Sequence, residues 1–227
     1  MRQITSDVYM LEHIGPAPAF LLVSNGLTLI DTGVPKKTST LIAEIEATNH
    51  ALSDLNQIVL THCHADHTGS VTELVKRTNA QVIAHQNEVP YLLQQQPLPA
   101  SSTFQKVLRA VADKIFSAHI DRVDTTVVDG DTIDALGGLQ VIHVPGHTPG
   151  SMALYQPERR IMFFGDIIFN ERGLKVAPNI FNVDTAKVTE AARKLAAYDI
   201  DVACFGHGEP FTENAGEKIR KFLQGSS

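Results

Sequence analysis

The chain of 227 residues has few cysteines and no long apolar runs. Its two cysteines, Cys63 and Cys204, are too few for a disulfide framework, so we expect two thiols in a reducing compartment. No segment approaches the roughly 18 apolar residues that a membrane span needs, and the N-terminus lacks the apolar core of a signal peptide. These absences predict a cytoplasmic protein with no membrane partner.

Aromatic residues and clustered charges are also scarce. Aromatic residues make up 6% of the chain, tryptophan is absent, and the net charge of -6 comes without any block of like charges. No stripe of Lys and Arg with interleaved aromatics occurs, so we expect a small-molecule substrate and no nucleic-acid partner. The composition is that of an ordinary globular protein, and this length fits one domain over residues 1–227. The sequence does not indicate an oligomeric state.

Local patterns predict an alternation of strand-rich and helical segments. Apolar runs on both sides of Asn25 and Gly26 predict a β-hairpin, because this dipeptide tolerates the positive φ of a tight turn. Residues 86–120 are rich in Pro and Gln and then become amphipathic, so we expect a helical insertion packed over one face. Its amphipathic positions are Val107, Leu108, Val111 and Ile115. Further helices are expected at residues 36–51, 70–78, 185–198 (with Asp184 as N-cap) and 213–224. This order favours two sheets with helices on their outer faces.

The segment THCHADHTGS, residues 61–70, concentrates groups that bind metal ions. Imidazole nitrogens and carboxylate oxygens are common ligands of Zn²⁺ and similar divalent ions. His62 and His64 are two residues apart in an extended segment, so their side chains point the same way and can bind one ion. Asp66 and His67 follow once the loop has turned, which places them to hold a second ion. Cys63 is expected to point in the opposite direction.

Three further candidate ligands follow later strands. His147 lies in VPGHTPGS, Asp166 in FFGDIIF and His207 in ACFGHGEP. Asp166 interrupts an apolar run, where a buried carboxylate is costly unless it is paired or coordinated. Each residue alone is compatible with a structural role, but as a set after HxHxDH they indicate ligands for two ions. His143, four residues before His147, is expected to be an ordinary strand residue.

Five short pieces, LIDTG, THCHADHTGS, GHTPGS, GD and GHG, occur in this order between about residues 20 and 210. In this combination the chain resembles the metallo-β-lactamase superfamily. The resemblance implies an α+β fold, an αββα sandwich of two mixed β-sheets with helices on the outer faces and the active site at one edge. It also implies two divalent metal ions, with Zn²⁺ expected and Fe or Mn as alternatives. The implied ligands are His62, His64 and His147 for the first ion, Asp66, His67 and His207 for the second, and Asp166 as a bridge.

The same resemblance implies a dinuclear hydrolase in which a metal-bridging hydroxide cleaves a carboxylic ester, thioester or lactone. Asp66 is implied to orient the hydroxide and to pass a proton to the leaving group. Asp31, in LIDTG, is implied to lie behind the metal loop and to orient a ligand or the loop backbone without binding an ion itself. Asp166 favours the glyoxalase-II-like and lactonase-like branches, because β-lactamases usually lack a bridging aspartate.

The residues around the substrate are less well defined by the sequence. Phe169 stands three residues after Asp166, where N-acyl homoserine lactonases usually carry a tyrosine, so that particular activity is not favoured. Phe169, Phe20, Tyr91 and Phe104 are candidates for an apolar substrate pocket, the alternative being that such side chains form core. Two other functions stay open. One is a mononuclear-iron, persulfide dioxygenase-like sulfur oxidoreductase, and the other is a phosphodiesterase or β-lactamase-type hydrolase of the same superfamily.

Overall fold

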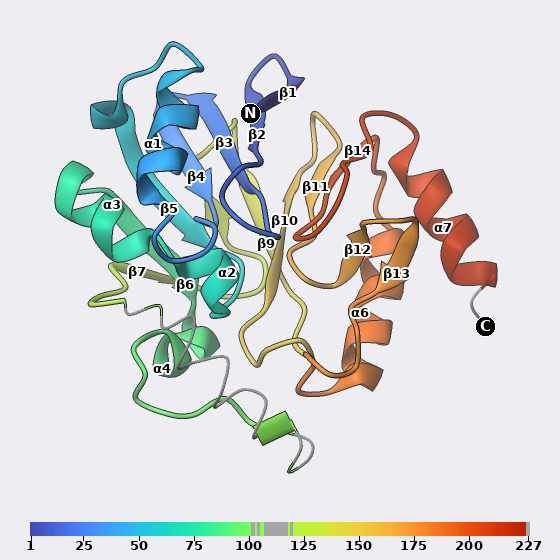
Figure 1. Cartoon of the computed structure of the whole chain (residues 1–227). Helices are drawn as coiled ribbons and strands as arrows, with labels where there is room; N and C mark the ends of the chain where they lie inside the picture. Colours follow the sequence, from blue (N-terminus) through green and yellow to red (C-terminus); the bar gives the residue numbers. More distant parts are fainter. Residues whose placement is uncertain (101–102, 104, 107–117, 119, 226–227) are drawn as a thin grey trace.

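The computed structural model describes residues 1–100, 103, 105–106, 118 and 120–225. Two mixed sheets pack face to face, and helices cover the outer face of each (Figure 1). The expected αββα sandwich is therefore confirmed. Among the described residues, none of the helices has the length and hydropathy needed to cross a bilayer.

The first sheet has seven strands that lie side by side in chain order. Strands β1 to β4 are antiparallel neighbours, whereas β4 to β7 run parallel. The strands are β1 (Arg2–Thr5), β2 (Val8–Leu11), β3 (Ala19–Ser24), β4 (Gly26–Ile30), β5 (Leu55–Leu60), β6 (Gln81–His85) and β7 (Thr125–Val127). The helices among them are α1 (Thr38–Glu46), η1 (Leu52–Asp54), α2 (Ala65–Thr68), α3 (Val71–Thr78), η2 (Gln86–Glu88) and α4 (Val89–Leu92).

The second sheet has five strands in the order β14-β11-β10-β9-β8, and only the β11–β14 pair is parallel. A separate two-stranded sheet pairs β12 with β13. The strands are β8 (Thr132–Ile133), β9 (Leu139–His143), β10 (Met152–Gln156), β11 (Ile161–Phe163), β12 (Ile168–Asn170), β13 (Leu174–Val176) and β14 (Val202–Cys204). The helices of this half are α6 (Thr185–Ala196) and α7 (Ala215–Gly225).

Three buried apolar clusters fill the three interfaces between the four layers. Ile30 and Leu154 belong to the cluster between the two sheets. Leu74 of α3 belongs to the cluster between the first sheet and its helices, and Val188 of α6 and Ile219 of α7 belong to the cluster on the second sheet. Each sheet is therefore apolar on both faces, as a strand layer between two other layers must be.

The hairpin predicted at Asn25 and Gly26 is confirmed. Ser24 of β3 pairs with Gly26 of β4, and Gly26 adopts a φ of +100° that favours glycine. Phe20 of β3 is only 4% exposed and packs edge-on against Phe163 in the core between the sheets, with 5.5 Å between ring centroids. The expectation that Phe20 lines a substrate pocket is therefore wrong. Its side chain takes the inward face of a strand whose two faces are both buried.

The segment predicted as a helical insertion begins with η2 and α4, two short helical turns after β6. The amphipathic helix expected from residue 107 onward, and the pocket candidate Phe104, lie outside the described residues. Gln105 is buried and its side-chain nitrogen donates to the backbone carbonyls of Ile180 (3.0 Å) and Asn182 (2.6 Å). The insertion therefore contacts the loop that precedes α6. The predicted N-cap of α6 is confirmed, because the Asp184 carboxylate accepts from the backbone N–H of Lys187.

Parallel strand pairs bring polar side chains to one edge of the sandwich. Asp31 follows β4, His62 follows β5, Asp166 follows β11 and His207 follows β14. Because β4 runs parallel to β5 and β11 to β14, the carboxyl ends within each pair lie together. His147 reaches the same edge from the loop between β9 and β10.

Candidate metal centre

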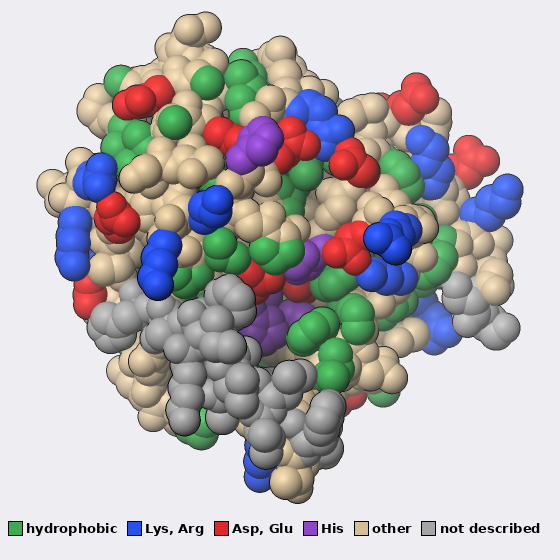
Figure 2. Space-filling model, viewed as in Figure 1, with side chains coloured by type: hydrophobic (Ala, Val, Ile, Leu, Met, Phe, Trp, Pro, Cys, Tyr) green, Lys and Arg blue, Asp and Glu red, His purple; other side chains and the backbone are tan. Residues whose placement is uncertain are grey.

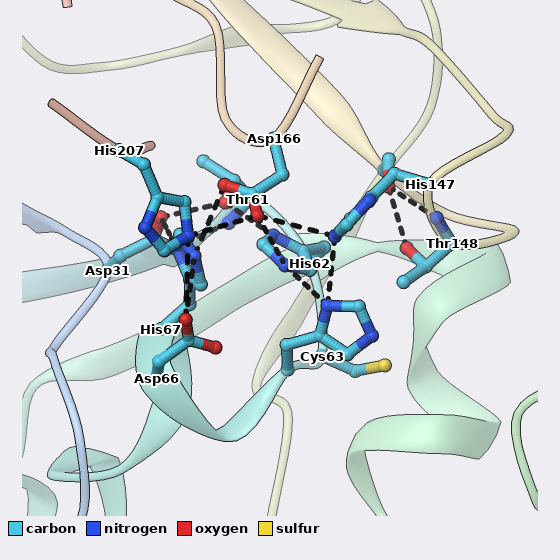
Figure 3. Close-up of polar contacts among 12 residues, drawn as sticks. Asp31, Thr61, His62, Cys63, Asp66, His67, His147, Thr148, Asp166 and His207 are labelled. Carbon is cyan, nitrogen blue, oxygen red and sulfur yellow. Dashed lines mark hydrogen bonds and ion pairs between the residues drawn. The ribbon is translucent and has the colours of Figure 1, made fainter. Parts of the chain in front are cut away.

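One group of potential metal ligands consists of His62, His64, His147 and Asp166, whose ligand atoms lie within 4.8 Å of one another. The Nδ1 atom of His64 is 3.1 Å from Nε2 of His62 and 2.9 Å from Nε2 of His147. Asp166 approaches with Oδ2, at 3.4 Å from Nε2 of His147. Figure 3 shows His62, His147 and Asp166 converging, with Asp166 between these two histidines on one side and His207 on the other.

The hydrogen bonds behind His62 determine which of its nitrogens carries the proton. The Thr61 hydroxyl donates to Oδ2 of Asp31 (2.7 Å), so towards His62 it can only accept. It therefore accepts from Nδ1 of His62, at 3.1 Å. As a result, Nε2 of His62 presents a lone pair to the group.

The same reasoning applies to His147. Asn182 is buried, and its amide nitrogen donates to the Ala177 carbonyl at 2.9 Å, which fixes the orientation of the amide. Its Oδ1 atom then accepts from Nδ1 of His147, also at 2.9 Å. Nε2 of His147 therefore also carries a lone pair that is directed at the group. Two lone pairs meet at the single Nδ1 atom of His64, which can donate at most one proton, so a cation satisfies this arrangement better than hydrogen bonds do.

The second group consists of Asp66, His67 and His207. Nε2 of His207 lies 3.4 Å from Oδ2 of Asp66 and 3.2 Å from Oδ2 of Asp166. Nε2 of His67 lies 3.3 Å from Oδ1 of Asp166. Asp166 therefore adjoins both groups through its two carboxylate oxygens, and it is only 6% exposed.

Asp31 orients His67 from behind. Its carboxylate accepts from the backbone N–H of Thr61 (2.8 Å) and from Nδ1 of His67 (2.8 Å), while its backbone has a φ of 58°. With Nδ1 donating to Asp31, Nε2 is the atom of His67 that can bind a metal ion. Nε2 of His67 and Oδ1 of Asp166 are both buried, and neither has a hydrogen-bond partner within the part of the chain that the structure describes. Such orphaned atoms are costly unless a cation joins them, so these residues fit a metal ion.

The electrostatics of the site reflect its crowding. Burial disfavours the charged form of Asp166, but the neighbouring His67 and His207 outweigh it and hold the pKa of Asp166 well below its usual range. Burial also opposes protonation of His67, yet Asp166, Asp31 and Asp66 raise its pKa well above the usual value. Burial and the nearby His67 lower the pKa of His62. Without metal, the carboxylates around His67 thus favour its protonated form, and a metal ion would take the place of the proton on Nε2.

Asp66 differs from Asp166, the other carboxylate of the site, in its access to solvent. Its side chain, on the one-turn helix α2, is 30% exposed, against 5% for Asp166 and 10% for His207. Figure 2 shows acidic and histidine side chains at the floor of a hollow, with hydrophobic side chains beside them. Asp66 is therefore the ligand-group carboxylate best placed to meet a substrate.

The other candidate residues are placed differently. The ring centroid of Phe169 lies 4.5 Å from that of His207, and the side chain is 4% exposed within the core cluster on the second sheet, so its role in a substrate pocket stays a prediction. Tyr91 is half-buried in α4, and its pocket role stays a prediction. Cys63 packs against the core cluster on the helix side of the first sheet, and its thiol points away from the ligand nitrogens, as predicted (Figure 3). His143 ends β9 and stacks on His85 at 4.0 Å, so it is indeed a strand residue.

Several residues that support the ligands were not identified from the sequence. Thr61 and Asn182 orient two histidines, and Glu88 is fully buried beside the metal loops. Gly206 is needed next to Asp166, because a Cβ atom there would lie 2.0 Å from Oδ1 of Asp166. Of these four residues, Gly206 alone could have been noticed in the sequence, because it stands next to the candidate ligand His207 in FGHG.

Two adjoining His/Asp groups at one edge of an αββα sandwich form a candidate metal centre, and the family of the chain places it among the metal-dependent hydrolases. The chain belongs to the metallo-beta-lactamase superfamily, whose family profile matches residues 14–207. Over 216 residues it is 29% identical to the probable metallo-hydrolase YflN of Bacillus subtilis (strain 168), covering 88% of this chain and 80% of that protein.

Two further likenesses differ in how much of the chain they cover. The hydroxyacylglutathione hydrolase of Ectopseudomonas mendocina (strain ymp) is 30% identical over 148 residues, which are 65% of this chain and 44% of that enzyme. Among solved structures, a metallo-beta-lactamase family protein from Thermus thermophilus superposes with a TM-score of 0.76 at 18% identity. The superposition covers 99% of this chain and 80% of the other, and it supports the fold alone.

Proposed function

We propose that the protein is a dinuclear metal-dependent hydrolase of carboxylic esters, thioesters or lactones. The observation that carries this proposal is the position of Asp166. Its Oδ1 atom faces His67 of one ligand group at 3.3 Å, and its Oδ2 atom faces His147 of the other at 3.4 Å. A buried carboxylate shared by two groups suits two adjacent divalent cations, with Zn²⁺ favoured by the imidazole-rich donor set and Fe or Mn as alternatives.

Two such cations, when bound, would supply an activated water and a Lewis acid for the substrate carbonyl. The protein residues then divide the remaining tasks. His62, His64 and His147 hold one position, while Asp66, His67 and His207 hold the other. Asp66 is the partly exposed carboxylate of the site, so it is placed to accept a proton from the attacking water and to pass it to the leaving group.

The substrate class is inferred from the surroundings of the centre. Phe169 packs against His207 with an apolar ring that suits an acyl group, and Nζ of Lys175 lies 5.7 Å from the centroid of that ring, so the surroundings combine an apolar wall with one cation. The relative named hydroxyacylglutathione hydrolase supports a thioester in particular, because acylated glutathione is a thioester. We also propose a reducing, cytoplasmic location, because two cysteines in 227 residues are too few for a disulfide framework.

A substrate panel with quantified metal tests the proposal. We expect turnover of at least one ester, thioester or lactone with two ions per chain, and no comparable turnover of a cephalosporin or a phosphodiester. Asp166→Ala should abolish turnover and lower the metal content, whereas Asp199→Ala, which changes an aspartate with a 76% exposed side chain, should alter neither. A single iron with O₂ consumption on a persulfide would overturn the hydrolase in favour of an oxidoreductase. Two ions and full activity in Asp166→Ala would overturn the dinuclear assignment.

A further inference from the structure

Glu88 is a fully buried carboxylate that the proposed chemistry does not use. It lies at the end of η2, directly after β6, and is 0% exposed. Burial raises the pKa of Glu88, while hydrogen bonds from Cys63, Thr148 and Gly150 act in the opposite direction. Burying a carboxylate lowers the stability of the fold unless hydrogen bonds or a cation compensate, so the position of Glu88 needs a structural explanation.

The hydrogen bonds of Glu88 provide that reason. Oε1 accepts from the backbone N–H of Cys63 at 2.8 Å, and Oε2 accepts from the backbone N–H of Gly150 at 2.6 Å. Cys63 lies between His62 and His64, and Gly150 lies three residues after His147. One carboxylate therefore joins the two loops that supply all three histidines of the first ligand group.

Glu88 packs closely against the backbone of Gly150. A Cβ atom at Gly150 would lie 2.4 Å from the backbone nitrogen of Glu88 and 2.7 Å from its Oε2. The absence of a side chain at Gly150 is thus what lets the carboxylate approach the loop of His147. We propose that Glu88 is a positioning residue that holds the two histidine-bearing loops in register for the first metal ion. This inference rests on the dinuclear site proposed above.

The substitution Glu88→Gln separates this role from simple filling of space. Each carboxylate oxygen accepts a backbone N–H, and an amide can accept at only one of the two places, because its NH₂ group would face the other N–H. Only one of the two loops can therefore stay attached. Changes of this kind behind metal ligands weaken binding by about 10- to 100-fold.

Glu44 offers a matched control within the same chain. It is also buried, at 8% exposed, and its two oxygens also accept two backbone N–H groups, those of Glu12 (2.8 Å) and His13 (3.2 Å). Glu44→Gln makes the same change from carboxylate to amide and also weakens the pairing of Glu44 with the His13 ring and the N-terminal ammonium, but none of these contacts involves the loops that carry His62, His64 and His147. Any loss of metal affinity that is special to Glu88→Gln then reflects the metal loops and not general destabilisation.

The experiment is a titration of the metal-free full-length chain with Co²⁺, followed by its visible absorption spectrum, together with chelator competition for Zn²⁺. We expect Glu88→Gln to bind the first ion about 10- to 100-fold more weakly and with an altered spectrum, while the second ion and the Glu44→Gln variant match the wild type. Glu88→Asp keeps two acceptor oxygens, so it should recover part of the affinity, and it serves as the test variant if Glu88→Gln does not fold.

The outcomes separate this inference from the function it rests on. If both Glu88 variants bind both ions as the Glu44→Gln control does, the positioning role is overturned while the dinuclear proposal stands. If the wild-type chain binds fewer than two ions, the dinuclear proposal itself fails. If both ions weaken equally in Glu88→Gln and Glu44→Gln, the effect is general destabilisation and Glu88 has no special role.

Discussion

Replacing Asp31 by Asn removes one charge from behind the metal centre and leaves the backbone undisturbed. Asp31 has a φ of 58°, a left-handed conformation that Asn tolerates as well as Asp does. Its carboxylate is 3% exposed and accepts three hydrogen bonds, from the Thr61 N–H (2.8 Å), the Thr61 hydroxyl (2.7 Å) and Nδ1 of His67 (2.8 Å). An Asn amide cannot accept all three, because one of its two terminal atoms is a donor.

The side-chain amide introduced by Asp31→Asn has two orientations, and their costs differ. If the NH₂ group faces the Thr61 N–H, a buried backbone donor loses its partner, at a cost of about 1–3 kcal/mol of stability. If the NH₂ group faces His67 instead, the imidazole proton can move from Nδ1 to Nε2. That N–H then points at Oδ1 of Asp166, 3.3 Å away, where the second ion would bind. We expect this second orientation, since a histidine can change its tautomer and a backbone N–H cannot become an acceptor.

The expected result for Asp31→Asn is a second ion bound about 10- to 100-fold more weakly, equivalent to roughly 1.4–2.7 kcal/mol. We expect the first ion to be weakened as well, because the oxygen that the NH₂ group replaces also accepts from the Thr61 hydroxyl, which fixes the tautomer of His62. Calorimetric metal titration measures the affinity, and nitrogen NMR of the histidine rings reports which nitrogen of His67 carries the proton. Asp124→Asn is a suitable control, because Asp124 accepts the backbone N–H of Val82 away from the ligands. Wild-type affinity for both ions, with the His67 proton still on Nδ1, would refute this reasoning.

Three further predictions concern packing and pH. Gly206→Ala should displace the Asp166 carboxylate, since the new Cβ would lie 2.0 Å from its Oδ1, and elemental analysis should find fewer than two ions per chain. Burial and the stacked neighbouring histidine lower the pKa of His85 to about 4 from 6.5, so unfolding free energy should fall as the pH drops from 6.5 to about 4. His85→Asn should remove that slope in urea titrations while keeping an N-cap. The pKa values of His67 and His207 are raised by neighbouring carboxylates against the effect of burial, so metal affinity should increase with pH until both are deprotonated, as measured by calorimetry.

Each of these three has a clear contrary result. Two tightly bound ions in Gly206→Ala would mean that the Asp166 carboxylate does not need the space beside that glycine. An unchanged acid slope in His85→Asn would assign the slope to other groups. Metal affinity that stops rising above pH 6.5, the ordinary histidine value, would contradict the raised pKa values of His67 and His207.

The sequence was most informative where a metal-binding side chain directly follows an apolar strand. His62, Asp166 and His207 each follow a strand that reads as apolar, and polar groups at such places are conspicuous. It was least informative for residues whose partners lie far away along the chain. Asn182 contacts His147 across 35 residues, and Glu88 contacts Gly150 across 62, and no local pattern encodes either pairing.

Phe20 illustrates a second reason why sequence reasoning failed. In β3, Phe20 and Leu22 face the core between the sheets, while Ala19 and Leu21 face the helix layer. Both faces of this strand are buried, so its apolar run carries no alternation that would tell an inward residue from one lining a pocket. The apolar residues that border the site had to be found from the structure, and of the described candidates Phe169 is the one placed beside a ligand.

Asp31 also connects the two ligand groups, although it touches only one of them directly. It accepts the proton of His67 and, through Oδ2, the proton of the Thr61 hydroxyl. Because that hydroxyl is committed to Asp31, it can only accept from His62, which keeps the Nε2 lone pair of His62 directed at the first group. A single buried carboxylate thus sets the tautomer of one histidine in each group. Metal binding at both positions then depends on one negative charge behind the loop, which is a physical reason for an aspartate to occupy a left-handed position at the end of β4.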